Sequence, residues 1–414
     1  MTNLYSRWQK KNIQGALKTR RVVLLNGSRQ CGKTTLAKQL VEKTTIFRTL
    51  DDLAMRQLAE NDPQSFVKHD GRTLIIDEIQ HVPALLSAIK KVVDEDTRPG
   101  QFLLTGSANI QSLPGIQESL AGRIRKIRLR PLAQGELLSA KPLFLQRAFR
   151  QSFSKQGGPT YDRKAILAMA FRGGFPEAIK LKETERRKWH RDYISALLER
   201  DLQDIARINR QSALQELIRI LAAWSGKYID ITAICAGLSI QRLTVESYLN
   251  ALEALYLVER VSPWTQTDYA RVGKQTKLFM TDCGLMASLL RWRMEQVELD
   301  ADRSGKLIET FVFNEIAAQI DASDGEYELF HYRDREQREI DLLIEREDHA
   351  LLGIEVKAGS AIGPSDFKHL KWFKENIAKK RPFVGVVLYA GELAGSMGKN
   401  LWAVPFTYLF SNSI

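Results

Sequence analysis

The first part of the fold is decided by residues 22–34, which read VVLLNGSRQCGKT. The apolar run predicts a buried strand, and the next eight residues fit the spacing G-x-x-x-x-G-K-[ST]. A helical pattern follows at 34–42, which gives the strand, loop and helix that this motif requires. Glycines let the backbone wrap a phosphate, and a helix N-terminus adds partial positive charge. The residues expected to form this phosphate-binding loop are Gly27, Ser28, Arg29, Gln30, Cys31, Gly32, Lys33, Thr34 and Thr35.

A second motif completes the expected nucleotide site. The apolar run 74–76 ends in Asp77 and Glu78, at the tip of a strand that would face the loop from a neighbouring strand. Lys33 would neutralise the β- and γ-phosphates, and the Thr34 hydroxyl would bind Mg²⁺. Asp77 would hold Mg²⁺ through water, and Glu78 would polarise the attacking water. The two motifs together predict binding and hydrolysis of ATP with Mg²⁺.

Short apolar runs alternate with helical patterns around these motifs. The runs 22–25, 46–50, 74–77, 102–105 and 124–129 predict a parallel sheet covered by helices. Thr105 and Ser107 follow the strand expected between the two motifs and would sense the γ-phosphate, although a strand-to-loop turn explains them equally well. Arg123 fits a solvated charge or an arginine finger supplied to a neighbouring subunit.

Composition limits the class of protein. The chain has 414 residues, of which 44% are hydrophobic and 27% charged, so two or three globular domains are expected. The formal net charge of +12 favours an anionic partner such as nucleic acid or anionic lipid, or else a solvated basic surface. Three scattered cysteines predict no zinc site and a reducing compartment. Residues 1–11 lack a signal-peptide pattern and the apolar runs are strand-length, so we expect a soluble cytoplasmic protein without a membrane span.

The middle of the chain is mainly helical. Residues 139–163 predict a basic connector or insertion, and 164–223 predict helices. Residues 231–255 predict a helix-turn-helix, and strands at 257–261 and 278–280 complete a resemblance to a winged helix. Glu246 and Glu253 on the recognition helix disfavour base reading, so a protein-interaction role stays open beside DNA contact. The candidate phosphate contacts are Arg242, Arg260, Arg271, Lys274 and Lys277.

The last part contains a group of carboxylates and a lysine. Asp341 lies on a predicted strand at 339–344, and Glu355 and Lys357 share one face of a second strand at 352–357. If the strands form a hairpin, Asp341 and Glu355 would bind Mg²⁺ and Lys357 would stabilise an attacked phosphate. Glu309, on a helix at 307–318, would complete the site. The pattern resembles the restriction-endonuclease-like fold, and the alternatives are a binding-only version of that fold or a salt-bridge cluster on an edge hairpin.

Several motifs resemble AAA-type ATPases of bacteria and archaea that carry a C-terminal domain of unknown function. The resemblance covers nearly the whole chain and implies an AAA-like core, ATPase activity and self-association. It implies no defined biological role. The strings that carry it are 27–34, 74–78, 104–108, 121–123, 173–177, 199–202 and 282–285.

These patterns predict an α/β protein in three parts. Residues 1–180 would form an AAA-like P-loop ATPase domain, 181–285 a helical and winged-helix-like region, and 286–414 a nuclease-like α/β domain. The expected function is ATP hydrolysis coupled to conformational change on DNA, with metal-dependent nuclease activity left open. The alternative is a signalling or scaffold ATPase whose ATP state gates a protein partner, with a non-catalytic nuclease-like domain.

Overall fold

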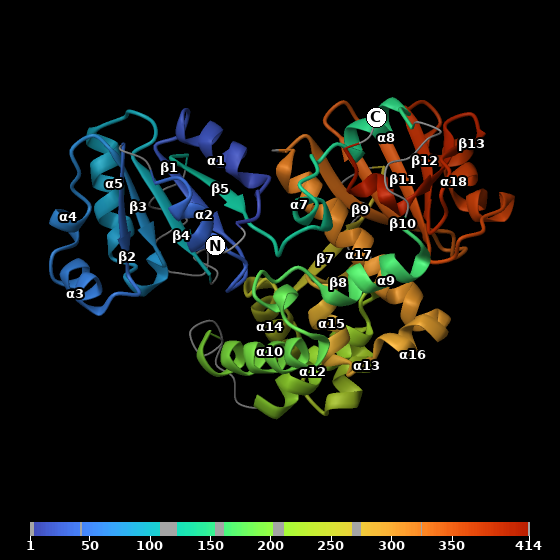
Figure 1. Cartoon of the computed structure of the whole chain (residues 1–414), viewed down its shortest axis with the longest axis horizontal. Helices are drawn as coiled ribbons and strands as arrows, with labels where there is room; N and C mark the ends of the chain where they lie inside the picture. The colour runs from blue at the N-terminus through green and yellow to red at the C-terminus, as the bar shows by residue number, and fades with distance from the viewer. Residues whose placement is uncertain are drawn as a thin grey trace.

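A computed structural model describes residues 4–41, 44–107, 122–153, 161–201, 211–266, 275–323 and 325–412. The chain forms an α/β structure in which a P-loop-type sheet lies beside a group of helices and a second, C-terminal sheet (Figure 1). The helix α17 (Ala301–Ala322) runs through the centre of the view, between the helices and the second sheet. No helix in the described ranges is long and apolar enough to cross a membrane.

The first sheet is parallel and has five strands in the order β2-β3-β4-β1-β5. This order confirms that β4 lies between the strands that carry the two nucleotide motifs. It also corrects the expectation that Asp77 faces the loop from the neighbouring strand, because β3 is the next strand but one from β1. The bounds are β1 Val22–Asn26, β2 Thr45–Thr49, β3 Thr73–Asp77, β4 Phe102–Gly106 and β5 Ile124–Arg128.

Helices cover both faces of this sheet, because alternate residues of its strands point to opposite faces. In β1, Val22 and Leu24 contribute to a core with α5 (Leu85–Glu95), α3 (Leu53–Asn61) and α4 (Pro63–Phe66). Val23 and Leu25 contribute to a second core with α1 (Gln9–Leu17) and α2 (Lys33–Lys38). Burial on both faces explains why the sequence of these strands is almost continuously apolar.

The middle region is helical and adds three strands. Helices α12, α13 and α14 precede the antiparallel pair β7–β8, and the short β6 pairs with β8. The predicted strand at 257–261 corresponds to β7, and the strand at 278–280 to β8. The bounds are α9 Arg163–Arg172, α10 Glu183–Ala196, α12 Gln211–Ala223, β6 Lys227–Tyr228, α13 Ile231–Leu238, α14 Arg242–Ala254, β7 Val258–Pro263, β8 Lys277–Met280, α15 Cys283–Leu289 and α16 Met294–Leu299.

The C-terminal part is built on a mixed sheet. Strands β9, β10 and β11 are antiparallel neighbours, and β11, β12 and β14 are parallel. Helix α17 covers one face and α18 the other. Through a short parallel contact between β7 and β9 this sheet continues into the strands of the middle region, so nine strands form one sheet. The bounds are β9 Tyr327–Arg333, β10 Glu339–Arg346, β11 Leu351–Lys357, α18 Lys368–Phe373, β12 Phe383–Tyr389, β13 Gly395–Gly398 and β14 Leu401–Pro405.

The predicted basic connector at 139–163 contains the helix α8 (Phe144–Arg150). Its residues Phe144, Leu145 and Ala148 are buried and contribute to the core that includes α17. This segment therefore joins the C-terminal sheet domain to the short helix α7 (Gln134–Leu137) by packing as well as by covalent connection. Residues 154–160 of the predicted connector lie outside the described residues.

An ionic junction holds the five-stranded sheet to the rest of the molecule. Arg130, just beyond β5, donates hydrogen bonds to both carboxylate oxygens of Glu259 at 2.7 and 3.1 Å and to Asp321 at 2.6 Å. Glu259 lies on β7 and Asp321 on α17, and Arg128 adds a second ion pair to Glu259 at 2.8 Å. Burial raises the pKa of Glu259, but the two guanidinium groups outweigh it and lower that pKa to about 2.

We predict that Arg130→Ala lowers the free energy of unfolding by about 3 kcal/mol, because it leaves Asp321 and half of the Glu259 charge uncompensated. Urea and thermal unfolding at neutral pH measure the loss. The stabilisation is present above the ordinary carboxyl value of 4.5, so the difference between wild type and variant should shrink as the pH falls toward about 2. Lys126→Ala, at an exposed position of the same strand β5, is the control, and an equal loss there would contradict the assignment.

Candidate nucleotide site and carboxylate cluster

The phosphate-binding loop has the backbone geometry that its glycines allow. Gly27 has a φ of 153°, and a Cβ there would lie 2.1 Å from the carbonyl oxygen of Leu129. Gly32 has a φ of 102° and directly precedes α2, whose first residue is Lys33. Residues that carry a side chain rarely adopt these backbone conformations. The close backbone approach therefore requires glycine at position 27, and the left-handed turn into the helix requires glycine at position 32.

Lys33 is buried and lies across the loop. Its Nζ donates to the carbonyl oxygens of Gly27 at 3.1 Å and Ser28 at 2.8 Å. Two carbonyl groups therefore hold the ammonium group at the loop. A phosphate that binds there would not have to displace a carboxylate from Lys33. This arrangement places a positive charge beside the backbone N–H groups at the start of α2.

Asp77 is the centre of the second motif. Its carboxylate is fully buried and accepts hydrogen bonds from Thr34 Oγ1 at 3.0 Å and from Thr105 Oγ1 at 2.5 Å. Burial raises the pKa of Asp77, and the nearby charges of Glu78 and Asp51 act in the same direction, while the two hydroxyl groups oppose them. The structure thus brings together the hydroxyl and the carboxylate that the sequence assigned to Mg²⁺. These are oxygen donors, which Mg²⁺ prefers.

Glu78 is positioned by its own backbone and by neighbouring side chains. It has a φ of 58°, an uncommon conformation for a glutamate, and its N–H donates to Thr105 Oγ1 at 3.1 Å. Gln80 donates to the Glu78 carboxylate and also to Ser107 Oγ at 3.1 Å. Gln80 was not expected from the sequence, although its spacing two residues after Glu78 is a signal for a local side-chain contact.

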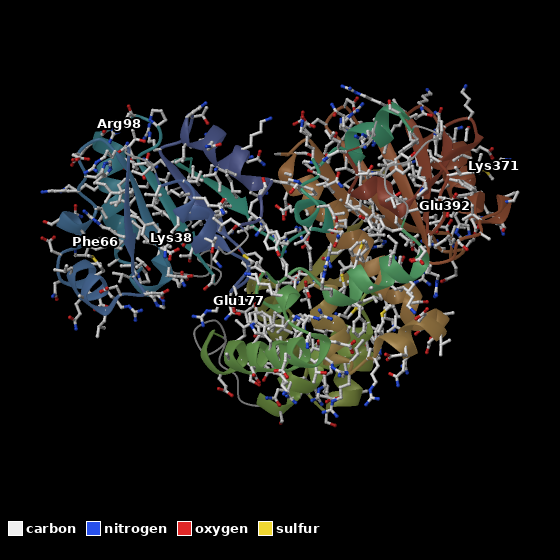
Figure 2. The ribbon with its side chains drawn as sticks, in the orientation of Figure 1. Lys38, Phe66, Arg98, Glu177, Lys371 and Glu392 are labelled. Atoms are coloured by element: carbon white, nitrogen blue, oxygen red, sulfur yellow. The ribbon has the colours of Figure 1, made fainter. Side chains whose placement is uncertain are left out.

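A cavity of about 630 Å³ adjoins these residues. It is lined by Arg29, Gln30, Thr34, Thr35 and Glu78, and on its other side by residues of the segment before α1 and of the segment 176–180. Glu177, in the latter segment, lies between the five-stranded sheet and the middle helices (Figure 2). The volume falls within the range of small-molecule sites, which is roughly 300–1,000 Å³.

Helix α10 of the middle region also reaches the loop. The Tyr193 hydroxyl donates to the carbonyl oxygen of Arg29 at 3.2 Å, and the Tyr193 ring stacks on Trp189 with centroids 5.2 Å apart. A residue of the phosphate-binding loop is therefore bonded directly to a helix of the middle region.

Arg123 lies away from this cavity. It precedes β5, which runs parallel to β1. It therefore lies at the amino end of the strands, and the loop that follows β1 lies at their carboxyl end. There it forms an ion pair with Asp94 on α5. The structure does not bring Arg123 to the site of its own chain, and a role toward a neighbouring subunit stays a prediction.

The C-terminal carboxylates gather around a lysine from the middle region. Lys277 Nζ lies 2.6 Å from Glu309, 2.9 Å from Glu339 and 3.3 Å from Asp341. Its side chain is 1% exposed. Burial opposes its charge, but the three carboxylates raise the pKa of Lys277 well above its ordinary value. The sequence predicted Lys277, just before a wing strand, as a phosphate contact, and the structure instead makes it the counter-ion of this cluster.

The hairpin predicted for Asp341, Glu355 and Lys357 is confirmed, because β10 and β11 are antiparallel neighbours. Asp341 accepts from the Val356 N–H at 2.9 Å, and Lys357 is 3.9 Å from Asp366. Burial raises the pKa of Glu355 well above its ordinary value, the Asp341 charge adds to this, and Lys357 opposes it. Burial also raises the pKa of Glu309, to about 7.

These carboxylates therefore fit a metal ion less well than the oxygen donors at the P-loop do. An ammonium group stands among Glu309, Glu339 and Asp341, where a divalent cation would need to be. Within the described ranges, no group of three or more His, Cys, Asp or Glu is arranged to hold a metal ion. The metal roles of Glu309, Asp341 and Glu355 stay predictions.

The other basic residues predicted to contact phosphates are also paired where they are described. Arg242 bonds Glu246 at 2.8 Å on the surface of α14, and Arg260 bonds Glu253 and Asn250. Glu253 and Glu246, which weakened base reading in the sequence, thus neutralise the same surface. Arg271 and Lys274 lie outside the described residues.

Three family models match successive parts of the chain. Residues 19–138 match the model described as an AAA domain, 163–296 a domain of unknown function (DUF8612), and 304–409 a domain of unknown function (DUF4143). The first match agrees with the five-stranded parallel sheet and the P-loop geometry. The chain therefore carries an AAA-type P-loop ATPase domain that binds ATP.

The chain is also similar to two proteins of known sequence and to solved structures. Two uncharacterized proteins, of Mycobacterium bovis and Mycobacterium tuberculosis, are each 27% identical over 398 residues, covering 95% of this chain and 82% of theirs. The Walker-type ATPase of Pyrococcus abyssi is 15% identical, with a TM-score of 0.42, covering 69% of this chain and 96% of that one. RuvB of Thermotoga maritima is 22% identical, with a TM-score of 0.27, covering 63% and 91%.

We predict that Lys277→Met destabilises the protein by about 3 kcal/mol in the absence of divalent cations, because it leaves Glu309, Glu339 and Asp341 without their buried counter-ion. If those carboxylates are able to hold a metal, Mn²⁺ should then raise the Tm of the variant but not that of the wild type. Lys357→Met on β11, the neighbour of the strand β10 that carries Asp341, is the control. A similar Mn²⁺ effect on the wild-type Tm would show that Lys277 does not exclude the ion.

Proposed function

We propose that this chain hydrolyses ATP with Mg²⁺ and passes its nucleotide state to the middle and C-terminal regions. The observation that carries the proposal is the contact of Thr34 Oγ1 with both oxygens of Asp77 at 3.0 Å. A hydroxyl from the phosphate-binding loop and a buried carboxylate two strands away meet at one point, beside the cavity. This is the oxygen pair that would hold Mg²⁺ against the phosphates.

Each further residue then has a defined role. Lys33 would offset the charge of the β- and γ-phosphates, and Glu78, fixed by Gln80 and Thr105, would orient and polarise the attacking water. Bound Mg²⁺ would neutralise charge that develops on the transferred phosphate. Thr105 and Ser107 lie close enough to Asp77 and Gln80 to respond to a terminal phosphate through those residues. Arg123 would act, if the chain self-associates, in a neighbouring subunit.

We predict that Glu78→Gln retains ATP affinity but lowers the turnover rate by about 10²-fold or more, because only the group that polarises water is lost. Lys33→Ala should weaken both ATP affinity and turnover, because it removes a charge that contacts phosphate in the ground and transition states. Isothermal titration with a nonhydrolysable analogue and a phosphate-release assay separate the two effects. Glu60→Gln, exposed on α3, is the control. Wild-type turnover in Glu78→Gln would remove Glu78 from this role.

The nucleotide state has two physical routes out of the ATPase sheet. One is the hydrogen bond from Tyr193 on α10 to Arg29 in the loop. The other is the junction of Arg130 with Glu259 on β7 and Asp321 on α17. We propose that these routes let ATP control how the remaining regions engage an anionic polymer, which the net charge of +12 would attract, and that this polymer is DNA.

A second candidate is a signalling or scaffold ATPase that gates a protein partner. The observation that favours it is Lys277, which neutralises the carboxylate cluster and fills its centre. In that arrangement the restriction-endonuclease-like domain, a proposal that rests on element order, would bind and not cut. The described basic residues of the winged-helix-like region are also paired with carboxylates.

We predict that DNA stimulates ATP hydrolysis several-fold at low salt, and that the stimulation falls steeply as salt rises because phosphate contacts release counterions. The phosphate-release assay is run with single-stranded and double-stranded DNA across a salt series. The Glu78→Gln variant tests for contaminating ATPase. Absence of both DNA binding and stimulation at low salt would favour the protein-partner alternative.

A further inference from the structure

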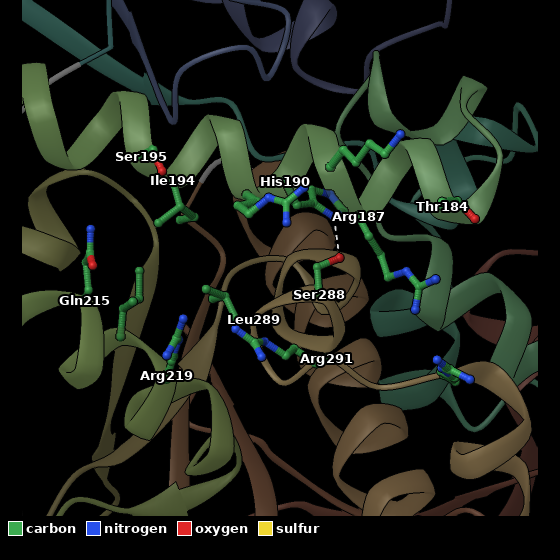
Figure 3. Close-up of a pocket in the computed structure, with 14 residues that line it drawn as sticks. Thr184, Arg187, His190, Ile194, Ser195, Gln215, Arg219, Ser288, Leu289 and Arg291 are labelled. Carbon is green, nitrogen blue, oxygen red and sulfur yellow. Dashed lines mark hydrogen bonds between the residues drawn. The ribbon is translucent and has the colours of Figure 1, made fainter.

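A second cavity lies in the middle region, on the opposite side of α10 from the phosphate-binding loop. Its volume is about 600 Å³, and α10, α12 and the end of α15 enclose it (Figure 3). In the close-up, Arg187 extends from α10, and Arg219 and Arg291 lie on the other side. Six cationic residues and no carboxylate line it within the described ranges: Arg187, Lys188, Arg191, Arg219, Arg291 and Arg293.

Half of these charges have partners on the surrounding surface. Arg187 pairs with Glu183 at 3.7 Å, Lys188 with Glu185 at 3.0 Å, and Arg219 with Glu216 at 3.7 Å. In the part of the chain that the structure describes, no ion pair engages the other three, which are Arg191, Arg291 and Arg293. The cavity therefore holds an excess of positive charge, and a bound anion would relieve the repulsion.

The backbone at Arg291 gives a second indication that this charge is placed for binding. The N–H groups of Arg291 and Trp292 donate to Ser288 and Ala287 at 3.1 and 3.0 Å, which ends α15 in a Schellman motif. Arg291 has a φ of 53° at the position where glycine is usual. A non-glycine residue there costs about 1 kcal/mol or more. The residue in this unfavourable conformation is one whose side chain lines the cavity.

The floor of the cavity is apolar and uncharged. Ile194 and Ile218 are buried, and Leu289 lies beside them in the lining. His190 is also buried, and its Nδ1 is 2.7 Å from Ser288 Oγ. Burial, with a contribution from Arg186, lowers the pKa of His190 to about 3, so the imidazole is neutral near pH 7. A lining that combines apolar side chains with cationic ones suits a ligand with a ring system and phosphate groups.

We propose that this cavity is a second ligand site, which binds a phosphorylated nucleotide unit separately from the P-loop. Arg191, Arg291 and Arg293 would contact the phosphates, and Ile194, Ile218 and Leu289 would contact the base. A duplex presents its phosphates on a convex surface and does not fit a cavity of this size. Two sources share the required chemistry: a free nucleotide, and the phosphorylated end of a DNA single strand. The strand-end form rests on the DNA-linked function proposed above.

Two binding measurements distinguish these sources. Isothermal titration of the full chain with a nonhydrolysable ATP analogue and Mg²⁺ should show two sites if a free nucleotide binds here. Lys33→Ala should then lose one site, and Arg191→Glu or Arg291→Glu the other. For the strand end, fluorescence anisotropy of a short 5′-phosphorylated single strand is measured on protein saturated with the same analogue. Each glutamate variant should weaken binding by about tenfold or more.

Arg335→Glu is the matched control, because Arg335 is exposed and lies between β9 and β10, away from the cavity. Its affinities should stay within about twofold of wild type, and thermal unfolding checks that the variants at the exposed Arg191 and Arg291 fold. The inference is overturned if the analogue binds at the P-loop alone and the single strand does not bind, or if the glutamate variants bind both probes as well as Arg335→Glu does. If ATP hydrolysis is normal in that case, this inference is wrong and the proposed function still stands. Probe binding without ATP hydrolysis would sink only the proposed function.

Discussion

The buried guanidinium of Arg130 is the interaction on which the arrangement of the molecule depends. It follows the last strand of the ATPase sheet and is shared by a carboxylate on β7 and one on α17. Removing such a charge from water is costly, and only close carboxylates on both sides offset that cost. The junction therefore fixes the ATPase sheet against two elements at once. The hydrogen bond of Tyr193 to the phosphate-binding loop depends on this relative placement.

The sequence could predict that Thr34 and Asp77 lie together because each belongs to a local motif at the end of a strand. Gly27 and Gly32 are required by backbone geometry, and Thr34 and Asp77 meet because each follows a buried parallel strand at the same sheet edge. The carboxyl ends of parallel strands lie at the same end of the sheet, and this can be predicted without information on the other domains. The antiparallel hairpin that carries Asp341 and Glu355 was predictable for the same reason, since strand spacing alone brings those residues together.

Contacts between distant segments were not predictable in this way. Lys277 was predicted as one of five basic phosphate contacts, and only the pairing of β8 with β7, and of β7 with β9, brings it to Glu309 and Asp341. Glu259 had no motif at all, and its role appears only when Arg128 on β5 and Arg130 just beyond it form ion pairs with it. Arg291 followed a helix pattern without a glycine, so nothing in the sequence marked its left-handed conformation.

Helix α10 has one consequence for energetics. Tyr193, on which Trp189 stacks, contacts the phosphate-binding loop, whereas Arg187, Arg191 and Ile194 form a different stripe that lines the basic cavity. One rigid element thus belongs to both surroundings. If occupancy of the cavity shifts this helix, and the shift alters ATP affinity by some factor, thermodynamic reciprocity requires ATP to alter the affinity of the cavity by the same factor.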